Sequence, residues 1–174
     1  MTSTSPLSFM FKDDGAVPNN SALPALLYKS AIALGADPAS ELERLFAHNG
    51  WGHGQWRDGI YPFTHYHSMI HETLGLARGR AQVRLGGDQG EVVELAAGDV
   101  AVLPAGTGHQ RLSASSDLLV IGAYPPQGTY NLCRADNPSD REKALKTIPL
   151  VPLPASDPVA GQDGPLPKLW RRAA

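Results

Sequence analysis

GIYPFTHYHSMIHETLGLARG, residues 59–79, carries its polar side chains in a pattern that suits two adjacent β-strands. Successive side chains of a strand point to opposite faces, so His65 and His67 share one face and Tyr66 takes the other. Glu72 follows after a short turn, at the start of the next antiparallel segment, where its carboxylate can return beside the two rings. The spacing therefore predicts two imidazoles and one carboxylate at a single site.

A second stretch, GDVAVLPAGTGH at residues 98–109, adds a fourth candidate ligand. Its Pro-Ala-Gly turn launches another strand with His109 at its head. Three neutral imidazoles and one carboxylate suit one divalent transition metal ion, either Fe, Mn, Ni, Co, Cu or Zn, and they do not select among these. Four ligands leave one or two coordination positions open. The alternative is a vestigial site, in which the histidines are ordinary polar residues with satisfied hydrogen bonds.

Around these stretches the chain is cut into short segments by 18 Gly and 15 Pro, which favours strands and turns over long helices. The predicted strands are YPFTHYH (61–67), HETLGLA (71–77), AQVRL (81–85), EVVEL (91–95), DVAVLP (99–104), HQRLSA (109–114) and DLLVIGAY (117–124). No helical pattern separates them, which indicates an all-β antiparallel barrel or sandwich rather than βαβ units.

The two stretches together resemble the paired motifs of the cupin superfamily in every spacing, from Gly59 to about Ser113. The second motif often ends in Asn where this chain has Ser113, but that position is not a metal ligand. The resemblance implies a double-stranded β-helix, the cupin jelly-roll barrel. Beyond the motifs, stretches such as NGWGHGQWRDGIYPF (49–63) and PASDPVAGQDGP (154–165) resemble the YjlB-like bacterial cupins nearly end to end. That likeness implies a fold and its ligands but no reaction.

The length of 174 residues suits one cupin domain over residues 1–174. Residues 1–58 are expected to form a partly helical extension, with a helix in DPASELERLFAHNG (37–50) and a second one near residues 23–34. Residues 59–125 form the barrel core. Residues 126–174 are expected to add a helix in NPSDREKALK (137–146) and a Pro-rich tail that wraps the barrel, with Trp170 as an apolar anchor.

The composition limits the partners and the cellular location that the chain can be expected to have. A formal net charge of -2 gives no reason to expect nucleic acid or an anionic membrane as a partner. Cys133 is the single cysteine, so no internal disulfide can form, and the first residues lack a signal-peptide pattern. We therefore expect a cytoplasmic protein with a small-molecule ligand. Family analogy adds a possible homodimer.

Other candidates have two interpretations each. His71 could replace Glu72 as ligand, but neighbouring residues point opposite ways, which favours Glu72 and leaves His71 near the ligands or exposed. Arg111 shares the inward parity of His109, so its guanidinium could hold a substrate carboxylate or form an internal salt bridge. Tyr61 and Phe63 share parity with His65 and are candidate substrate contacts, or core packing.

Two further features are weaker. His48, Trp51, His53 and Trp56 form an aromatic, Gly-rich segment that could close over a barrel mouth or pack on the barrel outside. Cys133 is either a small buried residue or a reactive thiol.

The pattern as a whole favours a metal-dependent enzyme of dioxygenase, oxidoreductase or isomerase type that acts on a small polar organic molecule. Glu72 is then also the catalytic residue, because a carboxylate beside the metal can take a proton from bound substrate. The alternative is a non-catalytic small-molecule-binding cupin with a structural or sensing metal. A catalytic site needs an exchangeable position that opens onto a pocket, whereas a structural site is closed.

Overall fold

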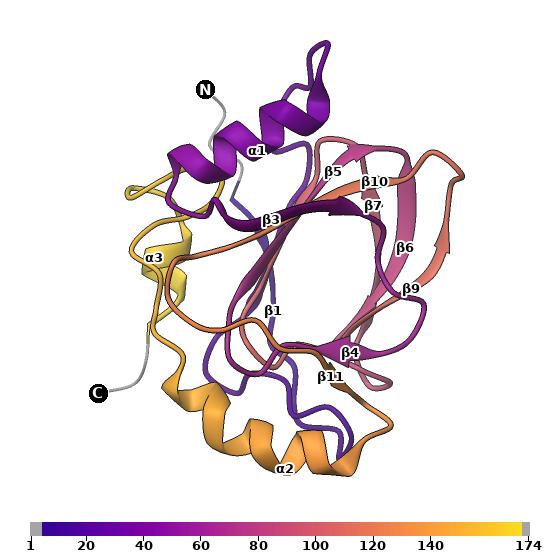
Figure 1. The fold of residues 1–174 in the computed structure, drawn as a ribbon, viewed down its shortest axis with the longest axis vertical. Helices are drawn as coiled ribbons and strands as arrows, with labels where there is room; N and C mark the ends of the chain where they lie inside the picture. Colours follow the sequence, from indigo (N-terminus) through magenta and orange to yellow (C-terminus); the bar gives the residue numbers. More distant parts are fainter. Residues whose placement is uncertain (1–4, 172–174) are drawn as a thin grey trace.

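The computed structural model describes residues 5–171 and contains two antiparallel sheets that face each other (Figure 1). The six-stranded sheet has the order β1 (Leu7–Phe9), β2 (Ala25–Tyr28), β8 (Val100–Leu103), β5 (Glu72–Arg78), β10 (Leu119–Tyr124), β3 (His53–Asp58). The five-stranded sheet has the order β11 (Cys133–Arg134), β4 (His65–Tyr66), β9 (His109–Ala114), β6 (Arg80–Leu85), β7 (Glu91–Ala96). Non-consecutive strands are neighbours in both sheets, as in the predicted jelly roll.

The space between the sheets is filled at one end by a buried apolar cluster. Its members come from alternate positions of both sheets and include Leu74, Leu76, Val83, Leu85, Leu95, Leu103 and Val120. Inward-facing residues at alternate positions are what a two-layer β-fold requires. The cluster leaves the other end of the interior to the polar side chains described below.

Helix α1 (Pro38–His48) covers the outer face of the six-stranded sheet, across β5 and β10 (Figure 1). It begins as predicted, with the Asp37 side chain accepting a hydrogen bond from the Ser40 N–H and Pro38 in the first turn. Gly75 allows the close approach, since a Cβ there would lie 2.9 Å from atoms of Leu42 and Phe46. The helix thus buries its apolar side on the strand that begins at Glu72.

The prediction of a second helix near residues 23–34 is wrong, because this segment contains strand β2, followed by turns, and no helix. All four residues of β2 are buried. Ala25 and Leu27 face the interior cluster, whereas Leu26 and Tyr28 face the apolar cluster beneath α1. A strand buried on both faces has no polar alternation, so its apolar run looks the same as that of a buried helix.

The strand predicted over residues 61–67 is shorter in the structure. Only His65–Tyr66 form β4, and the residues before them run as a loop along the rim of the barrel. Tyr66 points away from the interior into a separate buried cluster with Cys133 and Ile148. The alternation that the sequence predicted for His65, Tyr66 and His67 is therefore present.

The last third of the chain follows the outside of the barrel. Helix α2 (Pro138–Thr147) occupies the predicted position, capped by the Asn137 side chain, and leads into the 3-10 turn η1 (Ile148–Leu150). The short helix α3 (Leu166–Leu169) precedes Trp170, which is buried and donates from its indole Nε1 to the Pro24 carbonyl at 2.8 Å. Within residues 5–171, none of the helices has the length and apolar character needed to cross a bilayer.

Candidate metal centre

Two of the three predicted histidines lie on neighbouring strands of the five-stranded sheet, and the third directly follows one of these strands. His65 in β4 pairs directly with His109 in β9, and their ring centroids are 4.0 Å apart. His67 follows β4, with its ring 6.0 Å from that of His65. The candidate ligand atoms of the three rings all lie within 4.8 Å of one another, so these residues could hold a metal ion.

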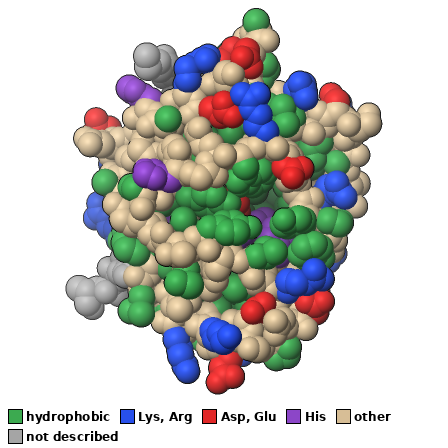
Figure 2. All heavy atoms as spheres, in the orientation of Figure 1, with side chains coloured by type: hydrophobic (Ala, Val, Ile, Leu, Met, Phe, Trp, Pro, Cys, Tyr) green, Lys and Arg blue, Asp and Glu red, His purple; other side chains and the backbone are tan. Residues whose placement is uncertain are grey.

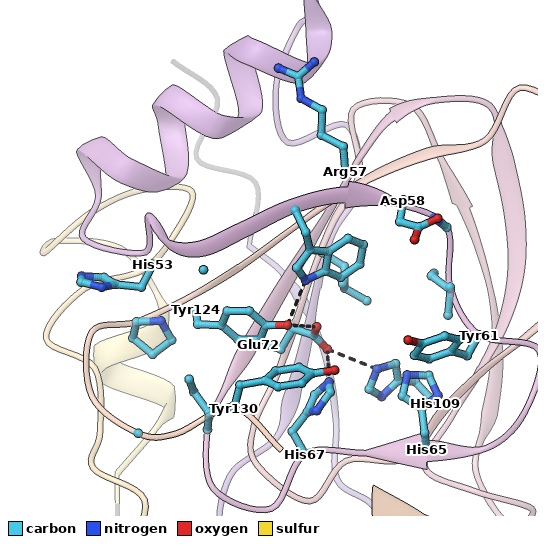
Figure 3. Close-up of a pocket in the computed structure, with 18 of the residues that line it drawn as sticks. His53, Arg57, Asp58, Tyr61, His65, His67, Glu72, His109, Tyr124 and Tyr130 are labelled. Carbon is cyan, nitrogen blue, oxygen red and sulfur yellow. Dashed lines mark hydrogen bonds and ion pairs between the residues drawn. The ribbon is translucent and has the colours of Figure 1, made fainter. Parts of the chain in front are cut away.

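Glu72 reaches the same point from the opposite sheet. It opens β5, and its Oε2 lies 3.2 Å from the Nε2 atoms of both His67 and His109 (Figure 3). All four side chains are at least nine-tenths buried. The structure thus brings together His65, His67, Glu72 and His109, the four residues that strand parity and spacing had grouped.

The backbone fixes which ring nitrogen carries the proton. The Nδ1 atoms of His65, His67 and His109 lie 3.0, 2.5 and 3.0 Å from carbonyl oxygens of Phe63, Asn131 and Thr107. A carbonyl can only accept, so each Nδ1 carries the hydrogen and donates it. In the neutral rings each Nε2 therefore keeps a lone pair, and those of His67 and His109 are aimed at Glu72.

This arrangement leaves the Glu72 carboxylate without a donor on one oxygen. Oε2 is buried, and no N–H or O–H group of residues 5–171 meets it in a hydrogen bond. Facing lone pairs in a buried place cost free energy unless a cation lies between them. The donor set, three imidazole nitrogens and one carboxylate oxygen, fits a divalent transition metal ion.

The pKa shifts of these groups show what the Glu72 carboxylate requires beside it. Burial raises the pKa of Glu72, but the rings of His67 and His109 outweigh it and hold this pKa well below the usual range. Burial and the neighbouring His109 lower the pKa of His65 to about 3, so its ring is neutral near pH 7. Burial also lowers the pKa of His67, but Glu72 outweighs this and raises it. The carboxylate needs a positive charge beside it, which a proton on His67 or a metal ion supplies.

The four side chains lie at the floor of a cavity of about 620 Å³ between the two sheets. Figure 2 shows the hollow on this face, ringed by hydrophobic side chains with histidine within it. Its apolar and aromatic lining includes Trp56, Ile60, Tyr61, Ile70, Leu74, Tyr124 and Tyr130. An ion held by these residues would therefore face an open space rather than a closed core.

Sequence comparison identifies the family. The chain is 37% identical over 163 residues to the uncharacterized protein YjlB of Bacillus subtilis (strain 168), a match that spans 94% of this chain and 95% of that protein. The chain belongs to the YjlB-like cupins. No protein-family model matches it.

Solved structures give weaker matches to this YjlB-like cupin. An acireductone dioxygenase from Bacillus anthracis, solved with a cadmium ion in its active center, is 16% identical with a TM-score of 0.40 and covers 60% of this chain and 80% of its own. A Klebsiella pneumoniae protein with a double-stranded beta-helix domain is 14% identical with a TM-score of 0.38, covering 79% of this chain and 84% of its own. Overlap at this level carries no information on function.

The site of this YjlB-like cupin includes Tyr124, which the sequence analysis did not assign to it, and Trp56, for which closing over the barrel mouth was one of two interpretations. Tyr124 of β10 donates from its hydroxyl to Glu72 Oε1 at 3.2 Å, and that hydroxyl accepts from the Trp56 Nε1–H at 2.9 Å (Figure 3). Trp56 packs against Gly122, where a Cβ would come within 1.9 Å of the indole. The alternation of side chains along β10 is a signal that could have identified Tyr124. Val120 faces the interior of the barrel and Ile121 and Ala123 face outward, so Tyr124, an even number of residues from Val120, faces the interior as well.

His71 of the YjlB-like cupin lies on the far side of β5 from the ligands. It is fully buried, so the expectation that it could be exposed is wrong. Its Nδ1 accepts from the Ala105 N–H at 2.9 Å, and its Nε2 faces the Pro152 carbonyl at 3.1 Å. Packing of the C-terminal tail over this face buries His71, as its ring centroid lies 4.8 Å from that of Trp170.

The candidate substrate contacts of the YjlB-like cupin lie at different depths. Arg111 lines the cavity, and its guanidinium forms no ion pair with any residue of 5–171, so the internal salt bridge is not found there. Tyr61 also lines the cavity, with its ring 5.1 Å from that of His65. Phe63 is not part of the lining and is stacked between Tyr61 and the guanidinium of Arg134.

Within the aromatic segment before β4, one residue packs on the outside of the barrel and others line the cavity, so each of the two interpretations holds for part of the segment. Trp51 is buried on the outside of the barrel and donates to the Ser156 carbonyl, whereas Trp56 and His53 line the cavity. Cys133 is buried beside Ser68 and Asn131, on the face of β11 away from the histidines, and burial raises the pKa of its thiol. Its surroundings match those of a structural cysteine.

Proposed function

We propose that this protein is a metal-dependent enzyme acting on a small polar organic molecule. The observation that carries the proposal is the coincidence of two features. When the rings are neutral, the Nε2 lone pairs of buried His67 and His109 converge on Glu72 Oε2 without a donor, and the point of convergence lies at the floor of a cavity. A structural site would be closed by protein on every side.

The ligands in this proposal are His65, His67, Glu72 and His109, and the ion is Fe, Mn, Ni, Co, Cu or Zn. When bound, such an ion polarises a substrate oxygen or exchanges electrons, which supports dioxygenase, oxidoreductase or isomerase chemistry. The ring N–H bonds to backbone carbonyls hold the three imidazoles in the required tautomer before any ion arrives.

Glu72 has a second role in the proposal, as the group that takes a proton from bound substrate. Its two oxygens are inequivalent. Oε2 faces the histidines, whereas Oε1 accepts a hydrogen bond from the Tyr124 hydroxyl. If Oε2 were to hold the ion, Oε1 would be the oxygen left to receive a proton. The Trp56 Nε1–H donates to the Tyr124 hydroxyl, which orients this hydroxyl toward Oε1.

The alternative, a non-catalytic cupin that uses the metal for structure or sensing, is disfavoured by the same cavity. A structural ion is enclosed by protein ligands, whereas these ligands adjoin a cavity of about 620 Å³. A sensing module would share the cavity, and turnover separates it from an enzyme.

The experiment has two stages. Elemental analysis of untagged protein is expected to give near-stoichiometric transition metal, lost in His67→Ala and retained in the control His48→Ala, a surface histidine of α1. The cobalt-substituted protein is then titrated with azide. A shift of its visible bands indicates an exchangeable position, whereas bands that do not respond, or a native protein that binds no metal after reconstitution, would overturn the enzyme proposal.

A further inference from the structure

The cavity is large for a short aliphatic acid. Its volume of about 620 Å³ lies in the range of pockets that enclose ligands with a substantial apolar body. A two- or three-carbon acid at the histidines would leave most of this space to water. The size therefore favours a substrate that extends from the ligands toward the rim.

The rim of the cavity carries two exposed aromatic rings. Tyr61 and Tyr130 are 48% and 51% exposed, and each lies 5.1 Å, between ring centroids, from a histidine: His65 for the first and His67 for the second. Figure 3 places Tyr61 on the side of His65 and His109, and Tyr130 on the side of His67. Aromatic rings on both sides of an entrance suit a flat apolar group between them.

The charged side chains around the cavity differ in whether they have hydrogen-bond partners within the protein. Arg57 is held by two hydrogen bonds to the Glu43 carboxylate, at 2.7 and 2.8 Å. Asp58 accepts from the Gly59 N–H at 2.8 Å. The Arg111 guanidinium has neither an ion pair nor a side-chain hydrogen bond to any residue in the described part of the chain.

Arg111 is also placed beside the aromatic rim. Its backbone N–H donates to the Tyr61 carbonyl at 3.0 Å, so the two residues are fixed side by side. In the β6–β9 register Arg111 pairs with Val83, a member of the interior cluster. A half-buried guanidinium with free donors is suited to a carboxylate, which it can bind through two parallel hydrogen bonds.

From these features we infer that the cavity takes an aryl carboxylic acid. The carboxylate pairs with Arg111, and the aromatic ring lies between Tyr61 and Tyr130, over the metal ligands. The inference rests on the proposed function, because it names the class of substrate for the same site. It assigns acid recognition to protein side chains alone and leaves the coordination positions of the ion to other oxygens of the substrate.

The test uses probes that cannot chelate a metal, and the Arg111 variants below separate binding by the side chain from coordination of a carboxylate to the ion. Calorimetric titration compares 3-phenylpropionate with 3-phenylpropan-1-ol, which lacks the charge, and with propionate, which lacks the ring. 3-Phenylpropylamine tests whether Asp58 makes the site select a cation. We expect 3-phenylpropionate to bind at least about tenfold more tightly than each of the other three, since charged hydrogen bonds and ring burial each contribute that much.

Variants locate the binding. Arg111→Gln should weaken 3-phenylpropionate roughly ten- to hundredfold and leave the alcohol unchanged, and Arg111→Lys should recover part of the loss. Tyr61→Ala should weaken the acid and the alcohol alike. The matched control is Arg84→Gln, on the neighbouring strand β6, whose side chain pairs with Asp88. This control should bind the acid as the native protein does.

Metal content measured on the same samples separates the two proposals. If the protein holds its metal but the acid binds no better than the alcohol, or Arg111→Gln binds it equally well, the substrate inference is overturned and the proposed function stands. If Arg111-dependent binding of the acid occurs in a protein that takes up no metal, the proposed function is overturned instead. Tighter binding of the amine also overturns the substrate inference.

Discussion

His71 and Glu72 are neighbours in the sequence and both are buried, yet they serve two different regions of the molecule. On the outer face of the six-stranded sheet, the His71 ring meets a donor at Nδ1 and a carbonyl at Nε2, and buried Asp157 accepts from Tyr28, Val159, Ala160 and Leu166. On the inner face, Glu72 Oε2 meets only the Nε2 atoms of histidines.

The difference separates buried polar groups that hold the fold from those that hold a ligand. Groups of the first kind have their hydrogen bonds satisfied by protein, so removing one leaves donors or acceptors orphaned and lowers stability. Groups of the second kind carry an unsatisfied pattern that an added ion completes. Substitutions in the two regions should therefore have opposite profiles in stability and metal affinity.

The largest effect is expected at Asp157, the centre of the outer hydrogen bonds. Asp157→Ala leaves the Tyr28 hydroxyl and three backbone N–H groups without their acceptor, and should lower the free energy of unfolding by about 3 to 5 kcal/mol. Urea titration of the metal-free protein measures this. The exposed Asp163→Ala serves as control. A variant that keeps its stability but loses metal would show that the two regions are not separate.

Glu72→Gln tests the inner region. The amide keeps the shape of the carboxylate and can donate to a histidine Nε2, which offsets part of the lost attraction between ionised Glu72 and a protonated His67, so the metal-free protein should lose much less stability than Asp157→Ala does. Its metal affinity should fall at least about a hundredfold. This fall is larger than the one expected when a group that only orients a ligand is removed. Competition with a chromophoric chelator gives the affinity, and exposed Glu91→Gln is the control. A large loss of stability without metal would place Glu72 with the structural group.

Tyr124→Phe should have a smaller effect on the same measurement. It removes the hydrogen bond to Glu72 Oε1 without emptying the space, and should weaken metal binding about tenfold. Tyr66→Phe is a close control, because Tyr66 lies between two ligands, points away, and has a buried hydroxyl without a hydrogen-bond partner in residues 5–171. Equal metal affinities in the two variants would rule out an orienting role for Tyr124.

The smallest effect concerns alkaline stability of the outer region. Burial, and then the hydrogen bond to Asp157, raise the pKa of Tyr28 far above its ordinary value of about 10. Above that pH the unfolded chain loses this proton and the folded one keeps it, so stability falls as pH rises, by about 1.4 kcal/mol per pH unit. Tyr28→Phe should remove about 1.4 kcal/mol of the fall in stability between pH 9 and pH 11, measured by urea titration across this range. An unchanged slope would contradict the assignment.

Much of the fold was predictable because the barrel strands obey local rules. Glycines lie in the turns that separate the strands from β5 to β9, Ser and Asp residues form the turn before β10, and alternation along β4 and β9 fixes which histidines face inward. The segment Ala25–Tyr28 was assigned to a helix because both of its faces are buried by parts of the chain remote in sequence. Residues Tyr61–Thr64 were assigned to a strand that the structure replaces with a loop along the rim.

The candidate site was predictable to the same extent. His65, His67, Glu72 and His109 were grouped because parity and turn spacing act over short distances. Trp56 and Tyr130 reach the site from β3 and from the loop before β11, and no periodic pattern announces such contacts. The single-domain organisation, the cytoplasmic location and the homodimer stay predictions.

The most direct test of the metal centre is anomalous X-ray scattering from crystals of the metal-reconstituted protein, collected at the absorption edge of the bound metal. The account predicts one strong peak between the two sheets, about 2.0 to 2.2 Å from the Nε2 atoms of His65, His67 and His109 and from Glu72 Oε2. It also predicts that the peak disappears in Glu72→Ala crystals or becomes much weaker. The account would be contradicted by an anomalous peak at surface histidines alone, or by the absence of any peak at a site whose side chains are well ordered in the crystal.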